Sequence, residues 1–311
     1  MRPMPRKYTA RPFIVAALAI LGTTGCLKQL ILDGQISSTR KASAAVNTLQ
    51  DYEVAEKAAM AGLAQIEGMR YLAPDNEDAL FMLTRSWASV SLGFIEDQME
   101  RTEDEEGTSA NWDYHKRRAE AGYDRAVWYG LQLLEKKAPD FKAATKNADT
   151  MKEYLKAFED PEDGELLFCV GNAWMSRANA GREKTELIGE IYVGVAMIER
   201  SVELDPNYMH GTGFAILGSY HARTRMAELD EAKGHFEKSL SLAGDKVLMP
   251  KVQMATRYYC NMGDKAGYEK LLNEVLAAGD GDPYQRLANV IAKRKASRWL
   301  GEKRQRENCG F

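Results

Sequence analysis

The sequence has little that points to an enzyme. Its 311 residues include only four cysteines and four histidines. No H-E-x-x-H, G-x-S-x-G, P-loop or dinucleotide-binding glycine motif occurs among them. We therefore predict a protein that is not an enzyme and that needs no cofactor.

Signals for β-strands are also scarce. Alternation of β-branched and polar residues over four or more positions, bounded by turn residues, hardly occurs. Apolar residues instead return at the spacing of one helix face. The predicted fold class is therefore all-α.

The cysteines do not suggest a disulfide framework or a metal site. Apart from Cys26, the chain holds only Cys169, Cys260 and Cys309, an odd set with no close pair and no histidine at zinc-like spacing. Cys169 lies in the apolar run 166–170, where a free cysteine is most often a small core residue. These residues imply no disulfide framework and no metal site.

An excess of basic charge is missing as well. The formal net charge of the whole chain is -3. The first 25 residues carry basic side chains and no acidic ones, so the chain without them is more acidic still. This balance disfavours nucleic acid as a partner.

The N-terminus has the layout of a secretion signal. An apolar run from Phe13 to Leu21 follows a basic stretch that contains Arg2, Arg6, Lys7 and Arg11. A membrane-spanning helix needs roughly 20 apolar residues, and this run ends at Gly22 after fewer than half that number. We expect residues 1–25 to be a signal peptide.

The segment from Leu21 to Cys26 resembles the lipobox of bacterial lipoproteins, with small residues before a cysteine. We predict cleavage before Cys26, lipid attachment to its thiol, and a tether over residues 26–48. Leu27 follows, in place of the aspartate that typically retains lipoproteins in the inner membrane. The expected location is therefore the periplasmic face of the outer membrane.

Helical-hairpin repeats follow in the spacing of the tetratricopeptide consensus. Large, small and aromatic residues recur in register at four first-helix positions. They begin at Leu80, Leu167, Phe214 and, more weakly, Lys251, and they reach Trp87, Trp174, His221 and Tyr258. One hairpin cannot bury its own apolar face, so neighbouring hairpins have to stack into a solenoid. We predict such a solenoid with insertions over residues 49–290.

Two stretches interrupt these repeats, an acidic segment from Glu96 to Gly107 and a second segment from Phe141 to Gly164. The roughly 285 residues after the signal suit either two small domains or one extended array, and the array is favoured. We expect the acidic segment to be a solvated, mobile loop. The basic residues 291–311 should form a solvated last helix that frays into a tail, while contact with an acidic partner or anionic headgroups stays open.

The repeats, in this order behind a lipobox, resemble the T-component family of TRAP transporters (TatT). The resemblance extends from about Asp51 to about Leu276 and depends on three segments, at 118–126, 167–174 and 201–218. It implies a helical periplasmic lipoprotein that partners the substrate-binding subunit of a tripartite ATP-independent transporter.

Aromatic residues on the expected first helices suit a concave channel for a lipophilic or organic-acid ligand. The candidate lining residues are Trp87, Tyr123, Trp174, Phe214, Tyr220 and His221. Packing in the core competes with this interpretation, most strongly for the two tryptophans.

Three classes of function remain in play. The first is a transporter-associated protein that docks the solute-binding subunit and shelters a ligand. The second is a general outer-membrane assembly or scaffold lipoprotein, and the third is a periplasmic enzyme. We favour the first class because of the family resemblance. Formation of a homo-oligomer stays open.

Overall fold

The computed structural model describes residues 13–223 and 228–311, and it describes side chains from Leu27 onwards. Within these ranges every regular element is helical and no strand occurs, which confirms the all-α prediction. The long helices are α1 (Phe13–Ala42), α2 (Tyr52–Leu72), α3 (Glu77–Val90), α4 (Glu96–Glu106), α5 (Ala110–Lys137), α8 (Pro161–Ala180), α10 (Ile191–Leu204), α11 (Thr212–His221), α12 (Leu229–Ala243), α15 (Lys265–Ala277) and α16 (Arg286–Trp299).

Shorter helices connect these elements. They are η1 (Ser43–Thr48), η2 (Ser91–Ile95), α6 (Phe141–Ala144), α7 (Ala148–Leu155), α9 (Thr185–Gly189), η3 (Tyr208–Gly211), α13 (Met249–Gln253), η4 (Met254–Tyr259), α14 (Cys260–Met262), η5 (Pro283–Gln285), α17 (Glu302–Arg304) and η6 (Gln305–Cys309). The second interruption predicted from the sequence thus contains α6 and α7.

Short polar side chains determine where α2, α3 and α5 begin. Asp51, Asn76 and Ser109 each accept a hydrogen bond from the backbone N–H three residues later, at the N-termini of α2, α3 and α5. Such caps satisfy backbone donors that lack a partner within the helix. Gly107, with φ of +71°, ends α4 in a conformation that favours glycine.

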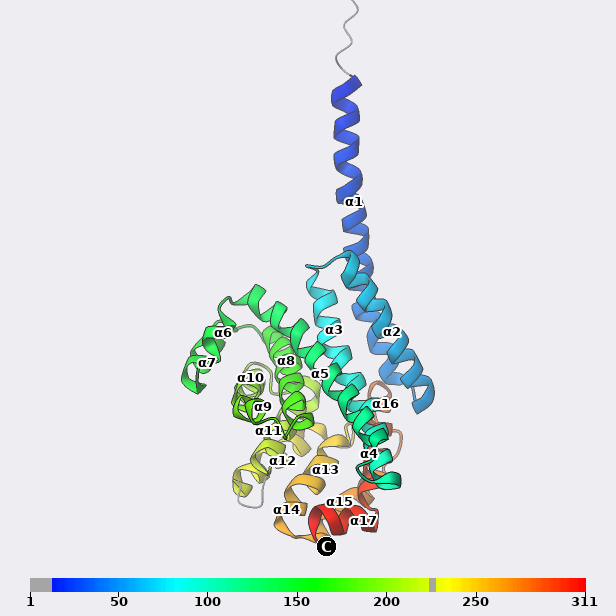
Figure 1. The fold of residues 1–311 in the computed structure, drawn as a ribbon, viewed down its shortest axis with the longest axis vertical. Helices are drawn as coiled ribbons and strands as arrows, with labels where there is room; N and C mark the ends of the chain where they lie inside the picture. Colours follow the sequence, from blue (N-terminus) through cyan, green and yellow to red (C-terminus); the bar gives the residue numbers. More distant parts are fainter. Residues whose placement is uncertain (1–12, 224–227) are drawn as a thin grey trace, which may run out of the picture.

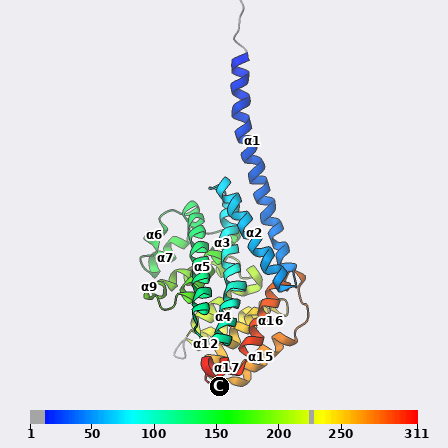
Figure 2. The ribbon, with the colours of Figure 1, turned by 45° about the vertical axis from the view of Figure 1, so that its right-hand side comes forward.

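The helices pack largely in chain order. α2 contacts α3, α3 contacts α5, α5 contacts α8, and the series continues through α10 and α11 to α12. The core between them contains fully buried large side chains that include Tyr123, Leu134, Leu167 and Phe236. The C-terminal helices α15 to α17 lie at the end of the molecule opposite the free end of α1 (Figure 1, Figure 2).

The N-terminal part of helix α1 extends away from the rest of the molecule (Figure 1), while its C-terminal part packs against α3 and buries Ile36. It runs without a break through the positions predicted to be the end of the signal peptide and the start of the tether. Arg40, near its C-terminal end, forms ion pairs with Asp78 and Glu165. Among the residues that the structure describes, no helix is long and apolar enough to cross a membrane.

The acidic segment is not the solvated loop that we predicted. It forms α4, in which Asp97 is buried, and its carboxylates bind cations of the C-terminal segment. Arg298 contacts Asp97 and Glu100 at 2.7 Å each, and Arg304 contacts Asp104 at 2.6 Å. Arg294 and Lys295 bind α4 in the same way, so the expected fraying of this segment into solvent is also wrong.

The cysteine prediction needs correction too. Cys260 and Cys309 form a disulfide across a sequence separation of 49 residues. Folding brings the C-terminal segment back onto α14, so a pair that is remote in sequence becomes close in space. Cys169 is buried in the core, as expected.

Candidate functional site

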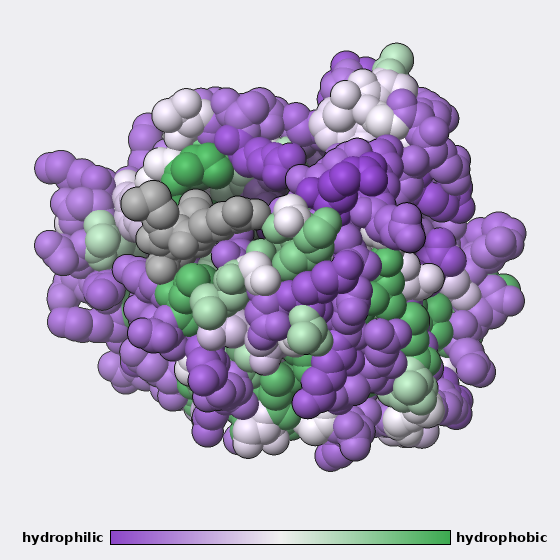
Figure 3. All heavy atoms as spheres, turned by 90° about the horizontal axis from the view of Figure 1, so that it is seen from below, coloured by the Kyte–Doolittle hydropathy of each residue, from purple (hydrophilic) through white to green (hydrophobic). Residues whose placement is uncertain are grey.

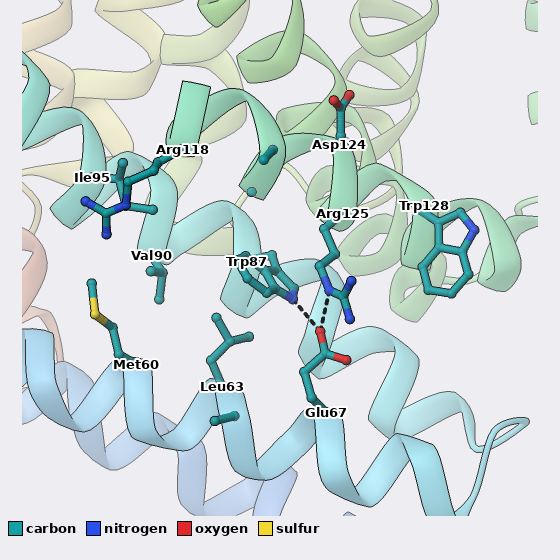
Figure 4. Close-up of a pocket in the computed structure, with 13 residues that line it drawn as sticks. Met60, Leu63, Glu67, Trp87, Val90, Ile95, Arg118, Asp124, Arg125 and Trp128 are labelled. Carbon is teal, nitrogen blue, oxygen red and sulfur yellow. Dashed lines mark hydrogen bonds and ion pairs between the residues drawn. The ribbon is translucent and has the colours of Figure 1, made fainter. Parts of the chain in front are cut away.

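A groove opens between α2, α3 and α5 (Figure 4). Its volume is about 1020 Å³, at the upper end of the range of small-molecule sites. Its lining comprises Met60, Leu63, Ala64, Glu67, Trp87, Val90, Ile95, Arg118, Ala121, Gly122, Asp124, Arg125 and Trp128.

Local irregularities in the backbone shape one wall of this groove. The helix that begins as α3 continues through a π-helical turn, Ser91–Ile95, into α4. Val90 and Ile95 stand at the two ends of that turn, and both line the groove. Opposite them, a Cβ atom at Gly122 of α5 would lie 2.1 Å from Ser91 Oγ, so glycine allows the two helices to approach closely. π-Helical turns within α-helices, such as Ser91–Ile95, often occur at functional sites.

The carboxylate of Glu67 connects the three helices. It accepts hydrogen bonds from Trp87 Nε1 at 2.8 Å, from Arg125 Nε at 2.6 Å, and from the Tyr129 hydroxyl. Burial alone would raise the pKa of Glu67, but the hydrogen bonds from Arg125, Tyr129 and Trp87 outweigh it, and the pKa is lowered. We call Glu67, Trp87, Arg125 and Tyr129 the Glu67 cluster.

The hydrogen bonds to Glu67 also shift the pKa values of Arg125 and Tyr129, which donate them. The hydrogen bond to Glu67 raises the pKa of Arg125. Burial, followed by the hydrogen bond to Glu67, raises the pKa of Tyr129 to about 12. All three groups therefore keep a fixed charge at neutral pH, and the groove has a stable electrostatic pattern.

Arg118 supplies a second cation to the groove, on the side of Ile95 (Figure 4). Its guanidinium donates to Gln98 Oε1 at 2.8 Å and lies 3.1 Å from His115 Nδ1. Both contacts are to neutral acceptors, and within the described ranges Arg118 forms no ion pair. It is therefore available to bind an anionic group in the groove.

This lining fits a particular class of ligand. Met60, Leu63 and Val90 offer an apolar surface, and the guanidinium of Arg118 lies beside it. Guanidinium groups bind carboxylates in a planar, two-bonded arrangement. An organic acid with an apolar body matches both properties. The lining residues include no serine, cysteine or histidine.

The structure distributes the six candidate residues over three places. Trp87 lines the groove and belongs to the Glu67 cluster. Tyr123 is fully buried, and its hydroxyl donates to Glu96 at 2.7 Å. Trp174 is 5% exposed and donates through Nε1 to the backbone oxygen of Glu190, as a core residue would.

The other three candidates lie together on α11. Phe214 and Tyr220 are half-buried and His221 is buried. The ring of His221 stacks on that of His235 from α12, which in turn stacks on Phe214. These residues do not line the groove between α2, α3 and α5.

The lipid-attachment prediction cannot be compared with side-chain positions. Cys26 lies on α1 before Leu27, in the part of the helix whose side chains the structure does not describe.

Sequence reasoning did not single out the groove residues of α2. Met60 and Leu63 have the spacing of ordinary core residues, and Glu67 resembles a solvated position of an amphipathic helix. A signal was present in α5, where Arg118 and Arg125 stand seven residues apart, and two helical turns place such residues on one face.

Comparison with known proteins identifies a similar chain. A curated relative from Treponema pallidum (strain Nichols), described as an uncharacterized protein, is 23% identical over 188 residues. That match covers 59% of this chain, and the chain spans 58% of the length of the relative.

A family model for the TRAP transporter T-component matches residues 48–306. The match includes all three helices of the groove, and it confirms the resemblance found in the sequence. It also reaches beyond Leu276, through α16 and α17. The chain therefore belongs to the TRAP transporter T-component family, which is a family of transporter components and not a class of enzymes.

Proposed function

We propose that this protein is a non-enzymatic accessory of a TRAP-type transporter that docks the solute-binding subunit. The family match over residues 48–306 is the observation that carries the proposal.

We propose further that the groove shelters the transported ligand near the docked subunit. The apolar lining and the unpaired charge of Arg118 support an organic acid with a hydrophobic body. Binding sites for small molecules are typically apolar cavities with a few well-placed polar groups, and this groove has that composition.

The rim of the groove is the proposed docking surface. Trp128 is 50% exposed there, and the guanidinium of Arg70 lies 5.4 Å from the centre of its ring. Tyr71, which is 84% exposed, lies at the end of α2. Tryptophan, tyrosine and arginine dominate the binding energy of protein interfaces. By contrast, the face at the far end from α1 is largely hydrophilic, with small apolar areas (Figure 3).

We also propose that the protein is a lipoprotein, anchored through Cys26 on the periplasmic face of the outer membrane. Two observations support this location. Disulfides such as Cys260–Cys309 persist mainly in oxidising compartments. Leu27, Leu30 and Ile31 directly follow Cys26 and are more than half exposed, which suits the boundary between headgroups and acyl chains.

The helical array itself fits a degenerate tetratricopeptide-like solenoid, which we propose as its architecture. The support is the packing of consecutive helices from α2 to α12. Extended faces of stacked hairpins suit a protein partner.

The docking proposal can be tested with the purified chain. Immobilised protein is exposed to periplasmic extract of the same bacterium, and retained proteins are identified by mass spectrometry. We expect a solute-binding protein, held with a dissociation constant near the micromolar range, or about 8 kcal/mol. Membrane anchoring raises the local concentration of the partners, so this affinity is sufficient.

Variants then locate the surface. Trp128→Ala should weaken binding of the recovered subunit by tenfold or more, while Tyr284→Ala, a change at another exposed aromatic residue, should leave it unchanged. Recovery of outer-membrane assembly factors or porin precursors, without a solute-binding protein, would favour the assembly-lipoprotein alternative.

A further inference from the structure

A second cluster of polar side chains lies far from the groove, where α11 meets α12. It contains His221, at the last position of α11, and two residues of α12, Glu231 and His235. One ligand atom from each of these three residues lies within 4.8 Å of the others. Within the described ranges this is the single group of at least three histidine, cysteine or carboxylate side chains with such a separation.

The distances within this cluster approach those of a metal centre. His221 Nε2 lies 3.4 Å from Glu231 Oε1, and His235 Nε2 lies 4.0 Å from the same oxygen. Two ligands of a tetrahedral zinc ion, each about 2.0–2.1 Å from the metal, are about 3.3 Å apart. The first pair is already at that separation, and the second has to close by less than 1 Å.

A fourth residue fixes the orientation of one imidazole. Glu228 Oε2 lies 2.7 Å from His221 Nδ1. A proton on Nδ1, donated to this carboxylate, leaves Nε2 with its lone pair directed towards Glu231. Metal-binding histidines almost always use their other nitrogen to donate to a carboxylate or a carbonyl in this way.

Aromatic rings pack against the two imidazoles on one side, and solvent reaches the cluster on the other. The His221 and His235 rings are stacked, with centroids 5.3 Å apart and planes 12° apart. Phe214 covers the remaining face of His235. The side chain of His221 is 10% exposed and that of Glu231 is 54% exposed, so the carboxylate lies on the solvent side.

One adjustment is required for both rings to share an ion. A metal lies in the plane of each imidazole that binds it, and nearly parallel planes cannot both contain one point between them. His235, which is a quarter exposed, therefore has to turn out of its stack with His221 and Phe214, about a Cβ–Cγ torsion with broad energy wells.

We propose that His221, Glu231 and His235 bind a divalent transition-metal ion of the zinc class, with Glu228 as the residue that orients His221. Two imidazoles and one carboxylate are ligands that zinc accepts, and one coordination position stays open to water. The ion would join the last turn of α11 to α12.

Sequence spacing did not reveal this site. His221 precedes Glu231 by ten residues, and the Glu231–His235 pair, one helical turn apart, is common on solvated helices. The site arises because the hairpin of α11 and α12 returns α12 alongside the end of α11. We therefore replace our earlier expectation that the chain has no metal site with this proposal.

The test uses the purified chain without a histidine tag, stripped of metal and titrated with zinc by calorimetry. We expect one ion per chain. Addition of Co²⁺ in place of zinc should give the visible absorption of cobalt in a tetrahedral site. An unfolding temperature that rises with zinc but not with magnesium would agree with binding to the folded state.

Matched variants make the test specific. Glu231→Gln and Glu237→Gln both change an exposed glutamate of α12, and only the first should weaken zinc binding, by at least tenfold. His235→Gln should do the same, while His115→Gln should not. Glu228→Gln should weaken binding by about 10–100-fold, the range for residues that orient a ligand.

Two results would overturn the proposal. One is the absence of any zinc binding at one ion per chain. The other is equal affinity of the Glu231→Gln and Glu237→Gln proteins. Because Glu231 and Glu237 are exposed, neither variant is expected to disturb folding, and their comparison stays valid even if His221 variants do not fold.

Discussion

At the scale of single residues, the groove depends on one carboxylate that holds three helices. Glu67 lies on α2, while its partners Trp87 and Arg125 come from α3 and α5. Hydrogen bonds to a charged acceptor contribute about 1.5–3 kcal/mol each, more than bonds between neutral groups. Glu67 therefore determines both the shape of the groove and the position of Arg125 within it.

We predict that Glu67→Gln lowers the free energy of unfolding by about 1–3 kcal/mol, because an amide cannot accept the same charge-assisted bonds. Urea unfolding, followed by circular dichroism, measures the change. Glu153→Gln is the control, since Glu153 forms a surface pair with Lys156 in which both side chains are more than 70% exposed. Such pairs contribute little. Equal stability of the two variants would contradict the prediction.

Glu67 also makes the stability of the folded protein depend on pH. The pKa of Glu67 is lower in the folded protein than its ordinary value. The stabilisation is therefore complete above the unfolded pKa of about 4.3, and it is lost as the pH falls through the lower folded value. Acid unfolding of the Glu67→Gln protein should lack this contribution, so the stability difference from the wild type should shrink as the pH is lowered from 6 to about 3.

Residue patterns predicted part of this site. Trp87 and the arginines of α5 were visible as repeat positions or as part of the family resemblance. The α2 side of the groove could not be predicted from the sequence, because Met60 and Leu63 have the same spacing whether they line a groove or a closed core. Only the packing of α2 against α3 and α5 decides between these two cases.

At the scale of elements, the contact between α4 and α16 shows why local sequence patterns were misleading. Read alone, the run of acidic residues in α4 repels itself and should be solvated. Its compensating cations are Arg294, Lys295 and Arg298, which are about 200 residues away along the chain. Charge compensation at such a separation depends on topology, and a local window cannot contain it.

We predict that Arg298→Met lowers the free energy of unfolding by about 3–5 kcal/mol, because the change leaves the buried carboxylate of Asp97 without one of its two cations. Lys156→Met is the matched control at an exposed pair and should change stability by less than about 1 kcal/mol. Hydrogen exchange should also become faster in α4. Unchanged protection of α4 in the Arg298→Met protein would show that the contact does not hold this helix.

The disulfide is a second connection of this kind, between α14 and the end of the chain. A disulfide that closes a loop of 49 residues stabilises the folded state by about 4 kcal/mol in the chain-entropy model. We predict that a reductant lowers the unfolding temperature of the wild-type protein and has no effect on a Cys260→Ser, Cys309→Ser double variant. A wild-type unfolding temperature that does not respond to reductant would contradict this prediction.

At the scale of the whole molecule, the two ends of the folded body have different roles. The C-terminal helices α16 and α17 bind back onto α4, so the end of the chain is fastened to the N-terminal part of the array. The N-terminal part of helix α1, in contrast, extends away from the body (Figure 2). From Cys26 to Leu32, which already packs against the core, it spans about 9 Å at about 1.5 Å per residue.

This geometry gives a physical role to the anchor that we propose. A lipid on Cys26 would hold the body close to the membrane, because the C-terminal part of α1 is fastened to the body through buried Ile36 and the ion pairs of Arg40 with Asp78 and Glu165. A single acyl chain binds a membrane only weakly, whereas two or more chains give stable anchoring. Attachment of a diacylglycerol at Cys26 therefore suffices without a membrane-spanning helix.

We predict that Cys26→Ser releases the protein from the membrane fraction into the soluble fraction of the cell envelope, because no lipid can be attached to the serine. Fractionation after a salt wash, followed by mass spectrometry of the intact protein, measures both location and modification. Cys169→Ser is the control, since that cysteine is buried in the core, and the protein should stay in the membrane fraction. If the Cys26→Ser protein also stays there, and its mass differs from that of the wild-type protein only by the replacement of sulfur with oxygen, then Cys26 is not the anchor. The groove would in that case have to meet its partner without confinement to the membrane surface.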